Sequence, residues 1–343
     1  MKHKTFFWFF LPTASAMLLF IALPIFSIVI QSLFTPHDAV IIVTENCDPF
    51  GCKQETTIDQ EATRDLRKSE PLGKFVGLEI YKDRGHLAVN EIKEIWVESN
   101  SFAEFRNNIG NLPFYRAMAF TLTFTFTVTP LMLVFGFIIA LAVNSLHQNL
   151  KGLTIFFSLL PMIVSPLIGS LVLFWMIDSR GIIGEALQYV LEDPDLSLKA
   201  STGLTWVMLI VYGVWHAAPF SFVVFYAGLQ TLPMDTIESA KIDGASRLQQ
   251  VWYVVIPHLM PLITFVALMQ LMDNFRVFEP IVGFSAEAHA QSLSWFIFND
   301  LGGETRLLSS AATSSVLTII GVSILLFPVL IRTWRDFNEK SAK

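Results

Sequence analysis

Residues 229–261 read LQTLPMDTIESAKIDGASRLQQVWYVVIPHLMP, a stretch of mixed polarity between two strongly apolar ones. Pro233 ends the preceding apolar segment, and Asp235 is predicted to cap a short helix that follows it. Gly244 permits a tight turn that a residue with a Cβ atom would resist. The stretch therefore begins as a helix followed by a turn.

A second, amphipathic helix is predicted after this turn, and two prolines are expected to break it where the next apolar segment begins. Its apolar residues and the two prolines are Leu248, Val251, Trp252, Val255, Pro257 and Pro261. The whole pattern indicates a helix–turn–helix with small residues at its tip, suited to insertion into a groove on a partner. An ordinary interfacial helical hairpin is the alternative.

The composition indicates a membrane protein. Of the 343 residues, 53% are apolar and only 15% are charged, and the mean hydropathy is +0.55. Soluble domains are about 25% charged, so this chain has too little polar surface for a water-soluble globule. Disorder, collagen-like repeats and a disulfide scaffold are excluded with it. The formal net charge of −6 offers no basic field for nucleic acid.

Long stretches without Asp, Glu, Lys or Arg each have room for one helix of about 20 residues, the length that crosses a bilayer. We predict six transmembrane helices, near residues 7–34, 117–144, 152–177, 204–228, 258–282 and 308–332. Because such helices close their own backbone hydrogen bonds, the fold class is an all-α integral membrane protein. A cleaved signal peptide is the alternative for the first helix, but its apolar run continues to Leu33, which favours a retained anchor.

Basic residues in short loops predict the orientation. With the N-terminus inside, nine fall in cytoplasmic segments: Lys2, Lys4, Lys151, Lys241, Arg247, Arg332, Arg335, Lys340 and Lys343. Three fall in short outside loops: Arg180, Lys199 and Arg306. Both termini are therefore expected in the cytoplasm. The expected organisation is a tip and first helix (1–35), an extracytoplasmic segment (36–115), a core with five helices (116–333) that contains the cytoplasmic loop 233–257, and a cytoplasmic tail (334–343).

Two cysteines, Cys47 and Cys52, lie in the expected extracytoplasmic segment. In an oxidising compartment they favour a local disulfide across a Pro-Phe-Gly turn over free thiols. A metal pair fits their spacing, but no His or further Cys completes four ligands. No metal site is therefore predicted, and no role is read for the insertion 36–74.

Motifs of known chemistry are absent from the sequence: there is no GxxxxGK[ST] phosphate loop, no HExxH and no GxSxG. No catalytic residue is predicted. One polar cluster stands near the end of the predicted fifth helix: Asp273, Asn274, Arg276 and Glu279. One charge at the membrane centre costs about 2.5–3.5 kcal/mol, so the cluster needs an explanation. It is either a self-neutralising structural network along one helix face or the polar lining of a translocation path, with Asn274 and Arg276 offering donors to a hydroxylated solute.

The stretch around Gly244 resembles the cytoplasmic loop of binding-protein-dependent ABC importer permeases of the sugar type. Their pattern is E-x-A-x-x-D-G-A, then an aromatic residue, then I-P before the next span. It is matched by Glu238, Ala240, Asp243, Gly244, Ala245, Trp252, Ile256, Pro257 and Pro261, while Ser239 replaces the usual second-position alanine.

Further segments are similar to the same family, over about residues 75–333. They are Phe75-Val76-Gly77-Leu78 with Tyr81, Leu160-Pro161, Trp215 and residues 227–233. Six spans with an extra first helix resemble the larger subunit of the maltose-type heterodimer. The stretch T-x-G-G-P, frequent in the family after the fifth span, is replaced here, which leaves the substrate class open.

The resemblance implies the type I ABC importer permease fold, with an extracytoplasmic insertion after the first helix, in the inner membrane. It also implies partners: a second permease subunit, two copies of a cytoplasmic ATPase and an extracytoplasmic solute-binding protein. ATP and Mg²⁺ would bind the ATPase, and this chain would hold no cofactor. The implied cargo is a sugar, oligosaccharide or polyol; a non-carbohydrate solute, an ion-coupled secondary transporter and a membrane-embedded enzyme are the alternatives.

Overall fold

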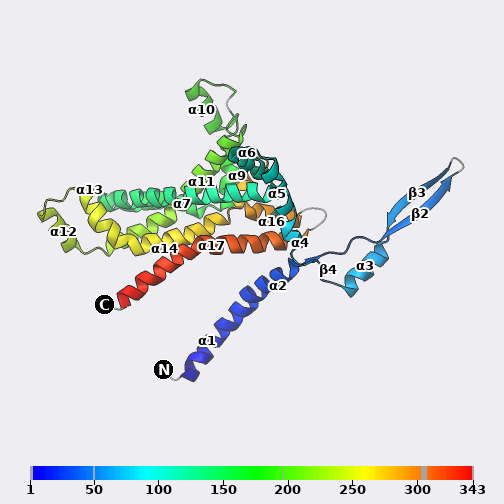
Figure 1. The fold of residues 1–343 in the computed structure, drawn as a ribbon. Helices are drawn as coiled ribbons and strands as arrows, with labels where there is room; N and C mark the ends of the chain where they lie inside the picture. The colour runs from blue at the N-terminus through cyan, green and yellow to red at the C-terminus, as the bar shows by residue number, and fades with distance from the viewer. Residues whose placement is uncertain (1–2, 49–50, 196, 303–306, 342–343) are drawn as a thin grey trace. The chain divides into compact units, whose positions relative to one another are not determined.

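A computed structural model describes residues 3–48, 51–195, 197–302 and 307–341. The described chain is mostly helical (Figure 1). It divides into two compact units, one made of Met1–Arg116 and Phe296–Ile320 and the other of Ala117–Trp295 and Gly321–Lys343. The second unit contains most of the predicted membrane spans.

In the described part of the chain, five helices are long and apolar enough to cross a membrane. They are Phe6–Gln31, α7 (Pro113–Ser145), α11 (Thr202–Gln230), Arg247–Phe275 and the Leu308–Ile331 part of α17 (Leu308–Ser341). The first of these spans runs through α1 (His3–Met17), the π-helical turn η1 (Leu18–Ala22) and α2 (Leu23–Gln31). The fourth is made of α13 (Arg247–Gln250), the π-helical turn η2 (Val251–Val255) and α14 (Ile256–Phe275). A sixth apolar segment is the pair α8 (Gln148–Ile163) and α9 (Pro166–Met176). Counted as one span, this pair completes the predicted six and confirms the all-α membrane fold.

The third predicted span, 152–177, is not one straight helix. α8 and α9 are bent by 96° at Val164 and Ser165, where the backbone is extended. A residue before proline disfavours the helical region, and Ser165 precedes Pro166. The broken span therefore leaves backbone groups that need partners outside their own helix.

The prediction that Pro257 and Pro261 break the second loop helix was wrong, because the helix runs unbroken from Arg247 to Phe275. A π-helical turn ends directly before Ile256-Pro257, and the Ile256 N–H reaches back to Val251 O. This wider turn lets the helix pass the proline, which has no N–H to donate. The first span repeats the arrangement, with η1 directly before Leu23-Pro24.

The fifth span ends seven residues earlier than the predicted 282. The Arg276 N–H bonds to Asp273 O at 3.0 Å, a tight terminal turn, and the chain re-enters a helix only at α15 (Glu279–Gly283). Pro280 lies in the first turn of α15, where a proline is tolerated because its missing N–H would be unpaired there anyway.

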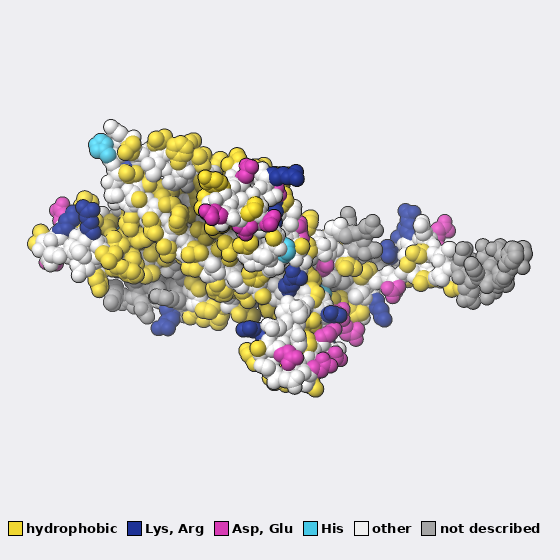
Figure 2. Space-filling model, turned by 90° about the horizontal axis from the view of Figure 1, so that it is seen from above, with side chains coloured by type: hydrophobic (Ala, Val, Ile, Leu, Met, Phe, Trp, Pro, Cys, Tyr) yellow, Lys and Arg dark blue, Asp and Glu magenta, His cyan; other side chains and the backbone are white. Residues whose placement is uncertain are grey.

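The second unit is organised around α11, which packs against α8 and α14, while α15 packs against α9. Two apolar clusters form its core, one around Phe120, Tyr212 and Ile281 and one around Met132, Phe222 and Leu259. Between α7 and α11 the backbones approach closely at Gly136. Figure 2 shows apolar side chains over much of the helical surface in view, as expected for helices that face lipid rather than water.

Asp178 follows α9 and accepts a hydrogen bond from Lys199 Nζ at 2.9 Å. This bond, a second from the Arg180 backbone N–H and the positive charge of Lys199 lower the pKa of Asp178 below its usual value. A lowered carboxyl pKa stabilises the fold above the unfolded pKa of about 3.9, and that stabilisation is lost as the pH falls through the folded pKa.

Asp178→Asn is therefore expected to unfold at a slightly lower temperature than wild type at pH 6, and the difference should be smaller at pH 3, which is below the unfolded pKa of about 3.9. Thermal unfolding in detergent across this range measures it, with Glu185→Gln on the nearby helix α10 (Ile182–Leu191) as the control. An equal difference at both pH values would contradict the assignment.

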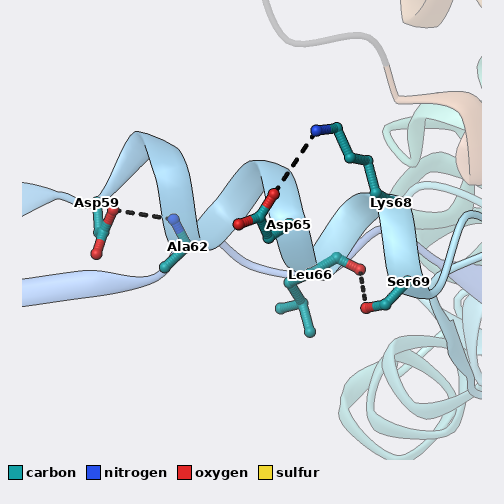
Figure 3. A network of polar contacts seen from close by, with 6 residues as sticks. All are labelled: Asp59, Ala62, Asp65, Leu66, Lys68 and Ser69. Atoms are coloured by element: carbon teal, nitrogen blue, oxygen red, sulfur yellow. Dashed lines mark hydrogen bonds and ion pairs between the residues drawn. The ribbon is translucent and has the colours of Figure 1, made fainter.

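The first unit holds the segment predicted as extracytoplasmic, which folds into short helices and strands. The strands are β1 (Phe34–Thr35) with β4 (Lys74–Phe75), and β2 (Ile41–Asp48) with β3 (Gly51–Ile58), each pair antiparallel. The helices are α3 (Gln60–Ser69), α4 (Glu79–Lys82), α5 (Val89–Glu98) and α6 (Phe102–Gly110). The second unit gives way to the first, in sequence, within α16 (Leu293–Gly302). Figure 3 shows the local bonds of α3, in which Asp59 caps the first turn by accepting from the Ala62 N–H at 3.0 Å.

Cys47 and Cys52 face each other in the β2–β3 register, but their side chains lie outside the described residues, so the disulfide stays a prediction. Paired antiparallel residues have Cα atoms about 4.5–5.5 Å apart, within the range that a disulfide spans.

The segment Phe75-Val76-Gly77, which resembles the family's F-V-G-L element, holds the end of the first span. Leu33 O accepts the backbone N–H groups of both Val76 and Gly77. Nearby, Tyr81 and Ser32 share a hydroxyl–hydroxyl hydrogen bond of 2.7 Å.

Candidate coupling loop and solute cavity

The helix–turn–helix of residues 233–257 is present, with its first helix α12 at Met234–Ile242 (Figure 1). Pro233 occupies the N-cap position of α12 without a side-chain cap, so the prediction that Asp235 is the cap was wrong; Asp235 lies in the first turn. In the first turn its negative carboxylate still interacts favourably with the positive N-terminal end of the helix dipole.

The turn at the tip is a glycine-dependent helix end. Gly244 has φ +81°, the left-handed region. Its N–H bonds to Lys241 O and the Ala245 N–H bonds to Ala240 O, both at 3.0 Å. This pair of bonds is the Schellman motif, whose left-handed position is usually glycine because a Cβ is penalised there.

The second helix of the loop starts with a capping box that the sequence analysis missed. Ser246 Oγ accepts from the Gln249 N–H at 3.4 Å, and Gln249 Oε1 accepts from the Ser246 N–H at 2.8 Å. Serine followed three residues later by glutamine is the sequence signal that predicts it. The two helices are therefore each fixed at the turn by their own caps.

The predicted loop residues fall into two groups. At the tip, the side chains or backbone of Glu238, Ser239, Asp243 and Gly244 are exposed, while Ala240 and Ala245 are half-buried. Ile256 and Pro257 lie more than two turns further along the continuous helix, away from the tip. Large apolar side chains are exposed along the loop: Met234, Ile242, Leu248, Trp252 and Tyr253. Exposed apolar side chains on a polar loop are typical of a docking site.

A cavity of about 540 Å³ lies within the second unit. All four residues of the predicted polar cluster line it, together with polar and aromatic side chains that the sequence analysis did not single out: Tyr212, His216, Phe220 and Gln270. Aromatic rings beside a few polar groups are typical of small-molecule sites. A signal for Gln270 was available, because it lies one turn before Asn274 on the same helix.

The polar cluster is not a single self-neutralising network. Arg276 Nη2 donates to Asp273 Oδ1 at 3.0 Å, and these two side chains are 60% and 68% exposed. Within the described part of the chain, Glu279 forms no ion pair with Arg276, because the helix ends at Phe275 and Glu279 belongs to α15. The alternative of a three-charge network along one helix face therefore lacks its last member.

Asn274 has a structural contact that separates it from its neighbours. It is 8% exposed, and its Nδ2 donates to Thr129 Oγ1 on α7 at 3.0 Å. The bond joins α14 to α7 inside the core, where an unpaired amide would be costly.

Thr129→Val keeps the shape of the side chain and removes the acceptor, leaving the buried Asn274 amide unpaired. We expect it to destabilise the protein by about 1–3 kcal/mol. Thermal unfolding in detergent compares it with Thr123→Val on the exposed face of the same helix. Equal stability of the two variants would show that the Asn274 bond contributes nothing.

Among the described residues, no group of three or more His, Cys, Asp or Glu side chains is arranged to hold a metal ion. The geometry thus defines a polytopic helical membrane protein with an exposed helical loop and an internal cavity of mixed polarity.

The family model described as binding-protein-dependent transport system inner membrane component matches residues 110–278. The chain is 29% identical over 190 residues to the probable ABC transporter permease protein YesP of Bacillus subtilis (strain 168), covering 54% of this chain and 59% of that protein. It is 26% identical over 233 residues to the sn-glycerol-3-phosphate transport system permease protein UgpA of Rhizobium meliloti (strain 1021), covering 66% of this chain and 78% of that protein. It is 30% identical over 193 residues to the multiple sugar-binding transport system permease protein MsmF of Streptococcus mutans serotype c, covering 54% of this chain and 64% of that protein.

One solved structure, a bacterial ABC transporter involved in the import of the acidic polysaccharide alginate, contains a chain that superposes with a TM-score of 0.58 at 20% identity. The superposition covers 80% of this chain and 98% of that chain, which shows a shared fold. Residues 110–278, just under half of the chain, are thus similar to the inner membrane components of binding-protein-dependent transport systems. The match spans less than two thirds of the length of YesP.

Proposed function

We propose that this chain is the transmembrane permease subunit of an ATP-driven, binding-protein-dependent importer. The observation that carries the proposal is the glycine-dependent tip of the 233–257 loop, exposed between two capped helices in a loop that also exposes apolar side chains. The loop lies within the stretch that matches the family model. On this proposal it docks into a groove of a cytoplasmic ATPase and passes the motion of the nucleotide sites to the membrane helices.

The proposed assembly contains a second permease subunit, two copies of the ATPase and an extracytoplasmic solute-binding protein. ATP and Mg²⁺ bind the ATPase, in keeping with the absence of a phosphate loop from this sequence. Both termini and the 233–257 loop face the cytoplasm of a bacterial cell, and the 36–115 segment faces outward. The basic residues in the short loops support this orientation.

The proposed cargo is a sugar, an oligosaccharide or a polyol. The names of UgpA and MsmF refer to transport of sn-glycerol-3-phosphate and of multiple sugars, which supports this class. The cavity has a size and a lining suited to such a solute, since its aromatic rings offer apolar faces beside polar groups such as Arg276 and Gln270. The cavity is therefore the proposed solute path, with Asp273, Asn274, Arg276 and Glu279 in its wall.

Affinity purification from native membranes in mild detergent, followed by mass spectrometry of every co-purifying chain, tests the assembly. We expect a second permease and an ATPase, with a solute-binding protein that supplies solutes for uptake assays. A lone chain or a homo-oligomer, under conditions that preserve known complexes, would refute the proposal and favour ion-coupled transport.

Arg276→Ala is expected to lower solute uptake by about tenfold while leaving the amount of assembled complex unchanged, because this side chain is exposed and supports no buried contact. Uptake into proteoliposomes and the yield of complex measure the two effects. Arg180→Ala, in a loop outside the cavity, is the control. Loss of the folded protein in Arg276→Ala would support the purely structural interpretation of the cluster.

A further inference from the structure

The break in the third span leaves backbone carbonyls without helical partners. Pro166 has no N–H, and the extended backbone at Val164 and Ser165 interrupts the ladder between α8 and α9. In a protein surrounded by hydrocarbon, carbonyl groups at such a break must find donors within the protein. The location of those donors decides where the span bends and how firmly.

Two side chains of α11, one turn apart, donate to carbonyls at the break: one is Val164 O, outside both helices, and the other is Pro166 O, in the first turn of α9. The Tyr212 hydroxyl donates to Pro166 O at 2.7 Å, and His216 Nε2 lies 3.2 Å from Val164 O. Because a carbonyl oxygen only accepts, His216 carries its proton on Nε2. The two rings also lie against each other, with centroids 5.8 Å apart.

Tyr212 is tightly packed between its own helix and α9. Tyr212 is 1% exposed, so its hydroxyl has no water to replace Pro166 O. A Cβ atom at Gly169 would lie 2.7 Å from that hydroxyl oxygen, so the glycine is what lets the hydroxyl approach α9. The contact between Tyr212 and Pro166 therefore depends on both helices: α11 supplies the hydroxyl, and α9 supplies the glycine that makes room for it.

The same residues border the cavity. Met162 and Pro166, on either side of the break, line it together with Tyr212 and His216. The position of the break therefore determines where Met162 and Pro166 line the cavity.

We propose that Tyr212 and His216 are positioning residues that hold the third span bent and thereby shape the solute path. Because His216 both borders the cavity and holds Val164, a solute that contacts His216 changes the bend, and a change of the bend alters the cavity. The role in transport rests on the proposed function, whereas the bend itself is testable without any solute.

Spin labels at Leu153 on α8 and Leu171 on α9, both exposed, report the bend in the assembled importer. Cys47→Ser and Cys52→Ser provide a background without native thiols. A straight helix would separate these positions by about 27 Å, and a bend near a right angle shortens this by roughly a third. We expect a narrow, short distance distribution in the parent protein without nucleotide.

Tyr212→Phe combined with His216→Leu should broaden this distribution and shift it by about 5 Å or more toward the straight-helix value. Gly169→Ala should act in the same direction, because it displaces the Tyr212 hydroxyl. His216→Gln retains a donor and should restore the short distance that His216→Leu loses. Tyr226→Phe, on the same helix but outside the cavity, is the control.

Each single variant is measured as well, so that the test survives if the double variant fails to fold. Unchanged distances in Tyr212→Phe, His216→Leu and Gly169→Ala would overturn the proposal. ATPase activity of the parent importer, with and without the loaded solute-binding protein, separates the two questions: absence of stimulation argues against the proposed function, whatever the spin-label distances show.

Discussion

Replacing Gly244 with valine is expected to reduce solute-stimulated ATPase activity of the assembled importer at least tenfold, to near its basal level. Gly244 has φ +81°, and a β-branched residue in this left-handed region is strained by about 1–3 kcal/mol. The strain opposes the two backbone bonds that close the turn, Gly244 N–H to Lys241 O and Ala245 N–H to Ala240 O. The tip would then lose the shape that the proposed groove receives.

The effect at position 244 is conformational rather than steric within this chain. A Cβ atom built at position 244 meets nothing within 4 Å, so a valine or an asparagine side chain has room there. Gly244→Asn is therefore the matched control, because asparagine tolerates the left-handed region far better than valine. We expect it to keep much of the stimulation.

ATPase activity in proteoliposomes, with and without the loaded solute-binding protein, measures both variants. Co-purification of the second permease shows that the variants still insert and assemble. Undiminished stimulation in Gly244→Val would remove the docking role from this turn.

The second large effect is expected at Gly136, where α7 crosses α11. A Cβ atom at Gly136 would lie 2.4 Å from Ser221 Cβ, 2.8 Å from Phe222 N and 2.9 Å from Ala218 O. Two of these atoms belong to the backbone of α11 and cannot rotate away. Small residues at helix crossings in membranes permit such close approach, and overpacking costs about 1–3 kcal/mol or more.

Gly136→Val should therefore destabilise the protein by about 3 kcal/mol or more, measured as thermal unfolding of the detergent-solubilised chain. Gly152→Val on α8 is the control, because nothing lies within 4 Å of a Cβ at that position. Ser221→Gly in the Gly136→Ala background should rescue stability only in part, since the backbone obstacles remain. Equal stability of Gly136→Val and Gly152→Val would contradict the close crossing.

Much of the architecture follows from composition and local pattern. The positions of the apolar spans agree with the described helices because each span needs only about 20 apolar residues in a row, a property that is local in the chain. The turn at Gly244 can likewise be predicted from the sequence. The left-handed position at a helix end favours glycine because a Cβ atom is penalised there, which depends on that residue alone.

The contacts of the polar cluster could be predicted only in part from the sequence. Asp273 and Arg276 are one helical turn apart, which predicted their ion pair, and the structure contains it. The partner of Asn274 is Thr129, 145 residues away, and no local pattern announces such a contact. The separation of Glu279 from the cluster depends on where α14 ends, which the apolar pattern places several residues too late.

Proline shows where local reasoning stops. Pro161 lies inside α8, Pro257 follows a π-helical turn in a continuous helix, and Pro166 coincides with a bend of 96°. The residue type is the same in all three, so proline alone does not place the bend. At the bend, the Val164 carbonyl, which lies outside both helices, and the Pro166 carbonyl, in the first turn of α9, accept from His216 and Tyr212 of another helix. A break in a membrane helix persists where a neighbour satisfies its backbone, and that neighbour is known only once the helices have packed.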